Sequence, residues 1–353
     1  MLVRQLFYFL FLLICFHAQA QYKIELVDSN TFALGKGVVL SKTSFRGLSV
    51  VDDQTIWVSG SKGTIAKSLD GGKTFEFTQL KGYEKSEFRD IEAFDDKRAI
   101  IMSSGTPAYI LKTIDGGQTW KEVYKNLDTA YFLDAMDFWD EKRGILVGDP
   151  IQGHFVLLQT KDAGETWQEL DTNLTPKAMI GEAVFAASGT SLRCWGTFGY
   201  VGFVTGGKIS RIIGANLSQK YIHWKSIKTK IIQGKSSQGA FSFTRNDSAE
   251  VIVGGDYLSD TLVLQNSCIK YHPPSKYEEI FDNNIDDVKG YRSCIEAITP
   301  SLFIACGTSG VDIYQNRIWN TISNNSYNVV RKAKKGKAVF LAGGKGRIGR
   351  LIY

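Results

Sequence analysis

Basic clusters, metal-binding motifs and cofactor fingerprints are scarce in this sequence. Its 353 residues include 42 Lys or Arg and 36 Asp or Glu, and the net charge of +6 is spread along the chain. Because nucleic-acid-binding surfaces concentrate positive charge, we expect no nucleic-acid partner. Only 4 His and 5 Cys occur, without a C-x-x-C pair. These counts argue against a structural zinc site, and we expect neither a metal nor another cofactor.

Proline is also rare, with 6 residues, whereas the chain contains 35 glycines and is 12% aromatic. Short runs of Val, Ile, Phe and Tyr lie between Gly, Asp and Asn residues, a pattern typical of strands joined by tight turns. With 43% hydrophobic and 22% charged residues, the chain is too apolar to be disordered. We therefore predict an all-β protein.

One apolar run stands apart, at the N-terminus. Arg4 precedes the apolar residues 6–16, and A-Q-A follows at positions 18–20. This is the pattern of a secretory signal peptide over residues 1–20, cleaved before Gln21. The alternative is an N-terminal anchor helix, but the run is too short to cross a bilayer. We expect an exported protein, periplasmic or secreted, without a membrane span after cleavage.

Two of the cysteines that remain after cleavage are expected to lie opposite each other on neighbouring strands. Cys294 and Cys306 flank T-P-S at residues 299–301. A hairpin centred on Pro300 places them opposite each other on two strands. A disulfide and a pair of buried free thiols both fit this arrangement, and the sequence leaves the choice open.

An eight-residue motif returns three times. It reads S-L-D-G-G-K-T-F at residues 68–75, T-I-D-G-G-Q-T-W at 113–120 and T-K-D-A-G-E-T-W at 160–167, with starts 45 and 47 residues apart. That period is typical of the four-stranded blades of a β-propeller. The motif is an Asp-box, in which the carboxylate caps its own turn. We therefore interpret Asp70, Asp115 and Asp162 as structural.

Each of these repeats predicts one four-stranded blade. First strands are expected at residues 45–51, 88–94 and 132–138, second strands at 55–59, 98–103 and 144–148, and third strands at 64–68, 108–113 and 154–160. Fourth strands begin at Phe75, Trp120 and Trp167.

The strand rhythm continues beyond the last Asp-box. A fourth blade is predicted at residues 183–187, 192–197, 200–205 and 222–232, a fifth at 240–244, 250–254, 261–265 and 268–272, and a sixth from 291 to 323. The tail offers three strands, at 328–333, 338–342 and 347–353. Residues 22–27 alternate like a strand and complete the last blade. The prediction is a seven-bladed propeller forming a single domain over residues 21–353.

The Asp-boxes and their spacing resemble those of the propellers related to the photosystem II stability and assembly factor. The blades of that family carry S/T-x-D-G-G-x-T-W at the same interval. The resemblance is clearest over residues 45–175 and extends to the C-terminus as a strand pattern. It implies a seven-bladed exported propeller that binds proteins and helps to assemble complexes. No residue here identifies a photosystem partner, so that role is not carried over.

Three arginines begin first strands, in F-R-G-L, F-R-D-I and Y-R-S-C. Arg46, Arg89 and Arg292 are therefore expected to line the central channel at one level, where guanidinium groups suit a carboxylate or phosphate. The alternative is a salt-bridge ring that neutralises itself. The acidic candidates for that ring, which also count as ligand-binding candidates, are Asp90, Asp134 and Glu182.

Further candidates fall on the face built by the turns between second and third strands. His154 follows D-P-I-Q-G, and aromatic residues occur over 198–203 and at Tyr257, next to Asp256. Tyrosine gives a large contact area at low ordering cost, so we predict a recognition rim here. One interpretation of His154 is a proton donor; a lone His in a glycine-rich loop is more often a hydrogen-bonding surface residue, which is the interpretation we favour.

These features favour a non-enzymatic, monomeric binding scaffold. It would present its channel to another protein or to a small anionic or carbohydrate ligand. The alternative is a glycoside hydrolase of the sialidase type, because sialidases also combine Asp-boxes with three arginines. The segment F-R-G-L lacks the proline of the F/Y-R-I/V-P signature, and the spacing of the candidate carboxylates, Asp149 included, cannot be assigned from sequence.

Overall fold

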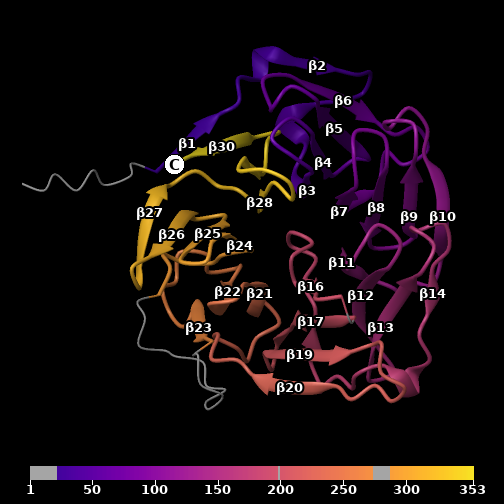
Figure 1. Ribbon diagram of the computed structural model, residues 1–353, viewed down its shortest axis with the longest axis vertical. Helices are drawn as coiled ribbons and strands as arrows, with labels where there is room; N and C mark the ends of the chain where they lie inside the picture. Colours follow the sequence, from indigo (N-terminus) through magenta and orange to yellow (C-terminus); the bar gives the residue numbers. More distant parts are fainter. Residues whose placement is uncertain (1–21, 198, 273–286) are drawn as a thin grey trace, which may run out of the picture.

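The protein is a closed ring of seven β-sheets around a central channel (Figure 1). The computed structural model describes residues 22–197, 199–272 and 287–353. Apart from three short 3₁₀ turns, the regular structure of these residues is β-strand. The predicted all-β, seven-bladed architecture is confirmed. The signal peptide predicted over residues 1–20 lies outside the described residues.

The first three blades have the strands that their Asp-box repeats predict. Blade 1 contains β3 (Phe45–Val50), β4 (Ile56–Gly60), β5 (Thr64–Ser68) and β6 (Phe75–Gln79), and β2 (Phe32–Leu34) pairs in parallel outside β6. Blade 2 contains β7 (Glu87–Ala93), β8 (Ala99–Ser104), β9 (Ala108–Thr113) and β10 (Lys121–Asn126). Blade 3 contains β11 (Leu133–Phe138), β12 (Gly144–Ile151), β13 (His154–Thr160) and β14 (Gln168–Glu169).

Burial within a blade follows strand position. The second strands β4 and β8 are buried at every residue, because neighbouring blades cover both faces of the sheet. Their sequences, I-W-V-S-G and A-I-I-M-S-S, are correspondingly apolar or small throughout. The outer strand β6, F-E-F-T-Q, instead alternates buried and exposed residues. A continuous apolar run therefore marks an inner strand, and alternation marks an outer one.

Each Asp-box forms the turn between the third and fourth strands. In the first box, the carboxylate of Asp70 accepts hydrogen bonds from the hydroxyls of Ser68 and Thr74, at 2.8 and 2.6 Å. Burial alone would raise the pKa of Asp70, but the hydrogen bonds from Thr74 and Ser68 outweigh it and lower the pKa to about 2. Asp115 and Asp162 make the same contacts in their own turns. All three carboxylates are committed to their turns.

Blade 4 differs from the prediction. Its strands are β16 (Leu192–Trp195), β17 (Tyr200–Val204), β19 (Arg211–Asn216) and β20 (Lys225–Lys228). Residues 192–197, predicted as the second strand, therefore supply the first. Of the predicted first strand, 183–187, only Ala183 is paired; together with Glu182 it forms the short strand β15, which pairs with β18 (Gly206–Gly207). Residues 184–191 instead lie in the channel, and the apolar residues 184–187 are buried or half-buried there without forming a strand.

Blade 5 differs in its outer half. Its main strands are β21 (Gln238–Arg245), β22 (Ala249–Asp256) and β23 (Ser267–Tyr271). Residues 261–265 form no strand, and the segment predicted as the fourth strand, 268–272, supplies the third. Residues 273–286, which follow it, lie outside the described residues. The apolar residues within 261–265 belong to a long exposed turn between β22 and β23.

Blades 6 and 7 confirm the prediction, including the closure of the ring. Blade 6 contains β24 (Cys294–Thr299), β25 (Leu302–Gly307), β26 (Gly310–Gln315) and β27 (Ile318–Ser323). Blade 7 contains β28 (Val329–Lys332), β29 (Val339–Ala342) and β30 (Ile348–Ile352). The N-terminal strand β1 (Lys23–Leu26) pairs antiparallel with β30 as its outer strand.

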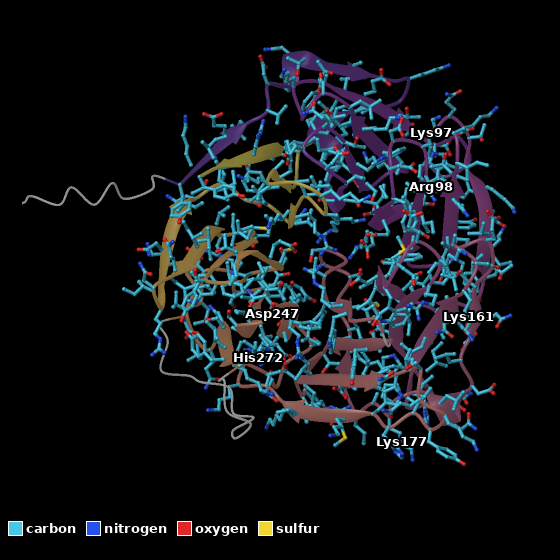
Figure 2. The ribbon with its side chains drawn as sticks, viewed as in Figure 1. Lys97, Arg98, Lys161, Lys177, Asp247 and His272 are labelled. Atoms are coloured by element: carbon cyan, nitrogen blue, oxygen red, sulfur yellow. The ribbon has the colours of Figure 1, made fainter. Side chains whose placement is uncertain are left out.

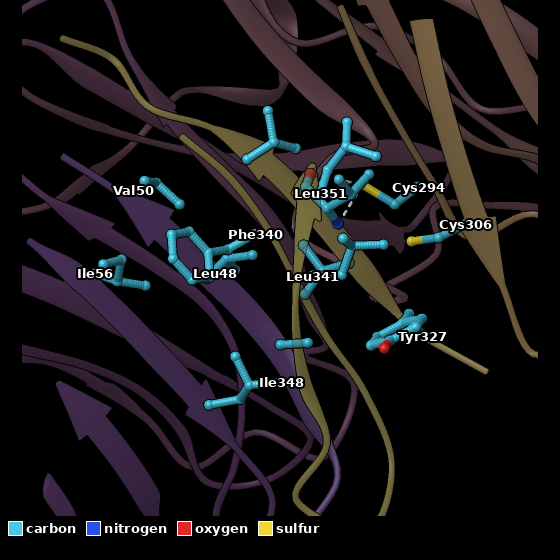
Figure 3. Close-up of a cluster of buried hydrophobic side chains, with 14 of the residues drawn as sticks. Leu48, Val50, Ile56, Cys294, Cys306, Tyr327, Phe340, Leu341, Ile348 and Leu351 are labelled. Atoms are coloured by element: carbon cyan, nitrogen blue, oxygen red, sulfur yellow. Dashed lines mark hydrogen bonds between the residues drawn. The ribbon is translucent and has the colours of Figure 1, made fainter. Parts of the chain in front are cut away.

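A large apolar cluster lies where the two ends of the chain meet. Leu48 and Ile56 of blade 1 pack there with Phe340 and Leu351 of blade 7 (Figure 3). Ile24 of β1 packs against the same cluster. Closing the ring therefore adds side-chain burial to the backbone pairing of β1.

The cysteine pair predicted from the hairpin lies in this region. Cys294 and Cys306 are opposite each other in the register of β24 and β25, and both are fully buried. Both are free thiols. The Cys294 thiol donates to the carbonyl oxygen of Val330 at 3.3 Å, which ties blade 6 to blade 7.

The described residues contain no helix long and apolar enough to cross a membrane.

Deleting residues 21–30 tests the closure of the ring. The deletion exposes the edge of β30, so we expect a lower melting temperature and aggregation. Ile24→Ser should cost about 1–2 kcal/mol of unfolding free energy, because it removes apolar burial at the closure. Leu26→Ser is the matched control, since Leu26 is 57% exposed on the same strand. Unchanged melting of a monomeric deletion variant would mean that β1 does not hold the ring closed.

Candidate functional site

The centre of the ring is filled by a segment of the chain that enters from the blade 3 to blade 4 connection. We call residues 184–191 the central segment; it is the loop in the middle of the ring in Figure 1. The backbone N–H of Val184 donates to Asp149 of blade 3 at 3.0 Å. The hydroxyls of Ser188 and Thr190 bind Ser293 of blade 6 and Ser242 of blade 5, at 2.7 and 2.6 Å. The central segment is thus held by strands from several blades.

Two of the three predicted arginines contact the central segment. Arg46 Nη1 donates to the carbonyl oxygen of Ala187 at 3.1 Å, and Arg89 Nη1 donates to that of Ala186 at 3.2 Å. Among the described residues, no carboxylate oxygen lies within ion-pair distance of either guanidinium, and Nε of Arg89 is buried without a hydrogen-bond partner. Burial, and then the charge of Arg46, lower the pKa of Arg89. The result is a pair of neighbouring cations whose hydrogen bonds go to neutral carbonyls, while carboxylate charges act on Arg89 only from beyond ion-pair distance.

Backbone bulges place these side chains in the channel. The pairing between first and second strands skips one residue in several blades, and the skipped residues are Arg46, Arg89, Asp134 and Phe241. A bulge turns the extra residue out of the regular alternation of a strand. The position of the bulge in each first strand therefore determines which side chain turns toward the channel.

Arg292 lies elsewhere, so the expectation of three arginines at one level is wrong. It is fully buried, and its Nε donates to Asp312 Oδ2 at 2.8 Å. Nη1 also donates to Ser309 Oγ at 2.6 Å and to the carbonyl oxygen of Tyr291 at 2.9 Å. The physical reason is the register: β24 begins only at Cys294, and its bulge lies near Thr299, at the other end of the strand.

The predicted carboxylates are buried and are not paired with these arginines. Asp90 accepts hydrogen bonds from the backbone N–H groups of Ile91 and Met136, both at 2.8 Å. Asp134 is fully buried, and neither of its carboxylate oxygens has a hydrogen-bond partner. Burial and the nearby charge of Asp149 raise the pKa of Asp134 well above its usual range. The amides of Ala186 and Asp149 offset this slightly but do not meet hydrogen-bond geometry.

Glu182 and His154 have local partners. Glu182, in the connection between blades 3 and 4, forms an ion pair with Arg211 of β19, with Nη2–Oε2 at 2.6 Å and Nε–Oε1 at 2.8 Å. The Nδ1 atom of His154 lies 3.4 Å from the hydroxyl of Thr175. Neither residue is linked by a described contact to Arg46 or Arg89. A ligand-binding role for any of these candidates stays a prediction.

The recognition rim is rearranged. We use "channel face" for the face formed by the turns between second and third strands and by the connections between blades; the opposite face is the Asp-box face. Because blade 4 starts one strand later than predicted, residues 196, 197 and 199 lie in the turn between β16 and β17, on the Asp-box face. Phe198 of the predicted rim lies outside the described residues. Tyr257 is on the channel face as predicted and is 46% exposed. Its neighbour Asp256 is buried and accepts a hydrogen bond from Gln238 at 3.0 Å.

The sequence interpretation missed an exposed apolar surface on the channel face. We call it the apolar rim; it lies over blades 4 and 5 and includes Ile180, 91% exposed, and Leu258, 76% exposed. Its other members are Met179, Tyr257, Leu262, Val263 and Leu264. Backbone hydrogen bonds connect the loops beneath it: the N–H groups of Lys208, Gly234 and Tyr257 donate to the carbonyl oxygens of Gly181, Gly207 and Ser237, respectively. Three consecutive apolar residues, 262–264, indicated part of this surface in the sequence, but we interpreted them as a buried strand.

At the Asp-box end, the channel opens into a cavity of about 440 Å³. Asp247, one of the residues that line this cavity, is labelled in Figure 2. Arg193 and Glu296, which line the cavity, form an ion pair at 2.8 Å. Arg331 lies 3.6 Å from Glu296 and donates through Nη2 to the carbonyl oxygen of Gly189, 3.4 Å away. Arg331 therefore links Glu296, in the wall of the cavity, to the central segment.

Among the described residues, no group of three or more His, Cys, Asp or Glu side chains could hold a metal ion.

Comparison with known proteins supports the resemblance seen in the repeats. Residues 102–179 match the family model described as photosynthesis system II assembly factor YCF48. A solved structure titled "YCF48 bound to D1 peptide" is 14% identical, with a TM-score of 0.63 over 94% of this chain and 95% of that one. YCF48 from Cyanidioschyzon merolae is 13% identical, with a TM-score of 0.62 over 93% and 98% of the two chains. No curated protein matches the chain. The predicted likeness to the assembly-factor propellers is confirmed, and the solved structures share the fold.

Replacing Asp134 tests the charge balance of the channel. A buried carboxyl whose pKa is raised destabilises the folded protein once it ionises, so stability falls as the pH rises above the unfolded value of about 3.9. Asp134→Asn removes that cost. We expect the variant to melt higher than the wild type at pH 8 and to converge with it below about pH 4.

Asp90→Asn is the comparison variant. Burial raises the pKa of Asp90 as well, but each oxygen of its carboxylate accepts a backbone hydrogen bond, and an amide can accept on its one oxygen only. Asp90→Asn should therefore gain less stability than Asp134→Asn at pH 8. If the wild type instead melts higher than Asp134→Asn at pH 8, the prediction is wrong, because the ionised Asp134 must then be stabilised by its surroundings.

Proposed function

We propose that this protein is an exported, monomeric binding scaffold that holds another protein on its channel face. The arginine pair Arg46 and Arg89 would bind an acidic group of the partner, and the apolar rim would bind its hydrophobic side chains. The observation that carries the proposal is the pair of guanidiniums without a carboxylate partner.

The electrostatics of the pair favour an anionic ligand. The hydrogen bonds to Ala186 and Ala187 each use one N–H of guanidinium groups that have five. A carboxylate forms shorter and stronger hydrogen bonds to guanidinium than a neutral carbonyl does. It would also relieve the repulsion that lowers the pKa of Arg89.

The apolar rim supports a macromolecular partner rather than a small ion alone. Large side chains such as Ile180 and Leu258 are mostly exposed there, and contiguous exposed apolar surface commonly marks a protein interface. Tyr257 connects the rim to the channel, since its ring packs edge-on against Phe185 of the central segment at 6.4 Å. Charge at the channel and apolar contact at the rim would then act on one partner.

The family likeness points in the same direction. The solved structure with the same fold contains, by its title, YCF48 with a D1 peptide. For the present chain this supports a peptide segment as the bound group, without naming the partner. The closed ring supports a monomer, because β1 covers the edge of β30 that would otherwise be free to pair with another chain.

The arginine pair is tested with Arg46→Gln/Arg89→Gln. Glutamine keeps a hydrogen-bond donor but removes the charge, so partner affinity should fall about tenfold or more. The matched control is Arg98→Gln/Arg143→Gln, which removes the same charge from surface ion pairs on the Asp-box face. Arg98 is labelled on the side of blade 2 in Figure 2.

The measurement is quantitative mass spectrometry of proteins captured from an envelope extract. Wild type and control should recover the same partner, and the arginine variant should lose it. Equal recovery by all three proteins would contradict the arginine site. If none of them recovers a partner, the scaffold proposal fails; turnover of a glycan panel would favour the carbohydrate alternative instead.

Export rests on the signal-peptide pattern of residues 1–20. We expect the mature protein to begin at Gln21 and to be found in the envelope or the medium, as measured by intact mass after cell fractionation. Leu12→Asp breaks the apolar run and should leave the full-length chain in the cytoplasm. A wild-type protein that keeps Met1 and stays in the cytoplasm would contradict export.

A further inference from the structure

The central segment is fixed at its two ends but only lightly held between them. Val184 is bonded to Asp149, and Ser188 is bonded to Ser293. Between these anchors, the hydrogen bonds that join residues 185–187 to the rest of the described protein are those donated by Arg46 and Arg89. We call residues 185–187 the tip.

The side-chain attachment of the tip is chiefly aromatic. The ring of Phe185 stacks on that of Phe241, with centroids 4.0 Å apart and planes 7° from parallel. Phe241 is itself a bulge residue and is buried, so the surface that receives Phe185 is fixed. Phe185 also meets Tyr257 edge-on, with ring centroids 6.4 Å apart. Of the two alanines that complete the tip, Ala187 belongs to a small buried cluster with Phe241 and Tyr291. The tip is therefore held chiefly by the Phe185 ring and by two charge-assisted hydrogen bonds.

The two carbonyl oxygens of the tip occupy the guanidiniums much as the two oxygens of a carboxylate would. The carbonyl oxygens of Ala186 and Ala187 are consecutive along the chain, and each accepts from a different guanidinium. A carboxylate likewise offers two oxygens to paired guanidinium groups, but with a negative charge. The backbone of the tip thus occupies donors that an acidic ligand requires.

We propose that the tip is an internal pseudo-ligand that keeps the arginine site closed until an acidic group displaces it. This inference rests on the proposed function, because it assumes that Arg46 and Arg89 bind an anion. The ligand and the tip compete for the same N–H donors. The apparent affinity is then the intrinsic affinity reduced by the fraction of molecules in which the tip is displaced.

The anchors limit how far the displacement extends. Thr190 contacts both Ser242 Oγ and Cys294 Sγ, at 2.6 and 3.5 Å, and Ser188 is fully buried. Residues 188–191 stay in place as part of the inter-blade core. Opening therefore involves the tip alone and leaves the propeller intact.

Phe185→Ala is the direct test, with the dicarboxylate succinate as the probe and neutral succinamide as its matched control. Removing the stacked ring weakens the closed state, and an aromatic pair of this kind corresponds to about a two- to tenfold change in equilibrium. Calorimetry should show succinate binding tighter by about that factor in Phe185→Ala than in the wild type. Succinamide should not bind either protein.

Tyr200→Ala is the control substitution. Tyr200 stacks on Trp195 at 6.1 Å on the Asp-box side of blade 4 and is 42% exposed, so its removal loosens the fold without touching the tip. Its succinate affinity should equal that of the wild type. Combining Phe185→Ala with Arg46→Gln/Arg89→Gln should abolish binding.

Hydrogen exchange of the wild type gives a readout that needs no variant. Succinate should speed the exchange of backbone amides at residues 185–187 and leave the anchors, Val184 and residues 188–191, unchanged. Slower exchange at the tip would overturn the inference, because it would mean that the tip closes over the ligand.

The outcomes separate the two proposals. Equal succinate affinity in wild type and Phe185→Ala overturns the pseudo-ligand and leaves the arginine site standing. Absence of succinate binding in both, with both proteins folded, overturns the arginine site and the pseudo-ligand with it. Tighter binding in Phe185→Ala that persists without the arginines overturns the competition on which the inference depends.

Discussion

The pairing of β1 with β30 is the constraint on which the rest of the propeller depends. Four residues from the start of the described chain complete a blade made from its end, and Ile24 joins the core shared by blades 1 and 7. Without that closure, blade 1 would be free to move relative to blade 7, and Arg46 would lose its fixed distance from the central segment. Closure therefore supports the geometry of the channel as well as the stability of the sheets.

Charge in the channel is balanced unevenly. Arg292–Asp312 is a buried ion pair within blade 6, and Glu182–Arg211 is an ion pair that ties the connection after blade 3 to blade 4. The hydrogen bonds of Arg46 and Arg89 instead go to carbonyl oxygens, and among the described residues no carboxylate lies within ion-pair distance of them. Buried charge is costly unless it is paired, and a protein that leaves two guanidiniums unpaired gives up stability at that point. Sites of this kind commonly serve binding, which is consistent with a scaffold that recognises an acidic group.

Much of the fold could be predicted because its blades carry local signals. Asp70 and its two counterparts fix a turn through contacts within eight residues, so the sequence alone reveals them. The errors arose where burial comes from distant parts of the chain. Residues 184–187 are apolar because several blades surround them, and residues 262–264 are apolar on an exposed face, so both segments resemble strands. Arg292 was misplaced because a one-residue bulge decides whether an arginine enters the channel, and no pattern of apolar residues reports it.

The central claim is that Arg46 and Arg89 form an anion site occupied by the protein's own backbone. A crystal structure of the wild-type protein grown with succinate tests it most directly. The account predicts a carboxylate between the two guanidiniums, with Ala186 and Ala187 moved away and Ser188 still bonded to Ser293. Both guanidiniums still bonded to the Ala186 and Ala187 carbonyls at saturating succinate would contradict it.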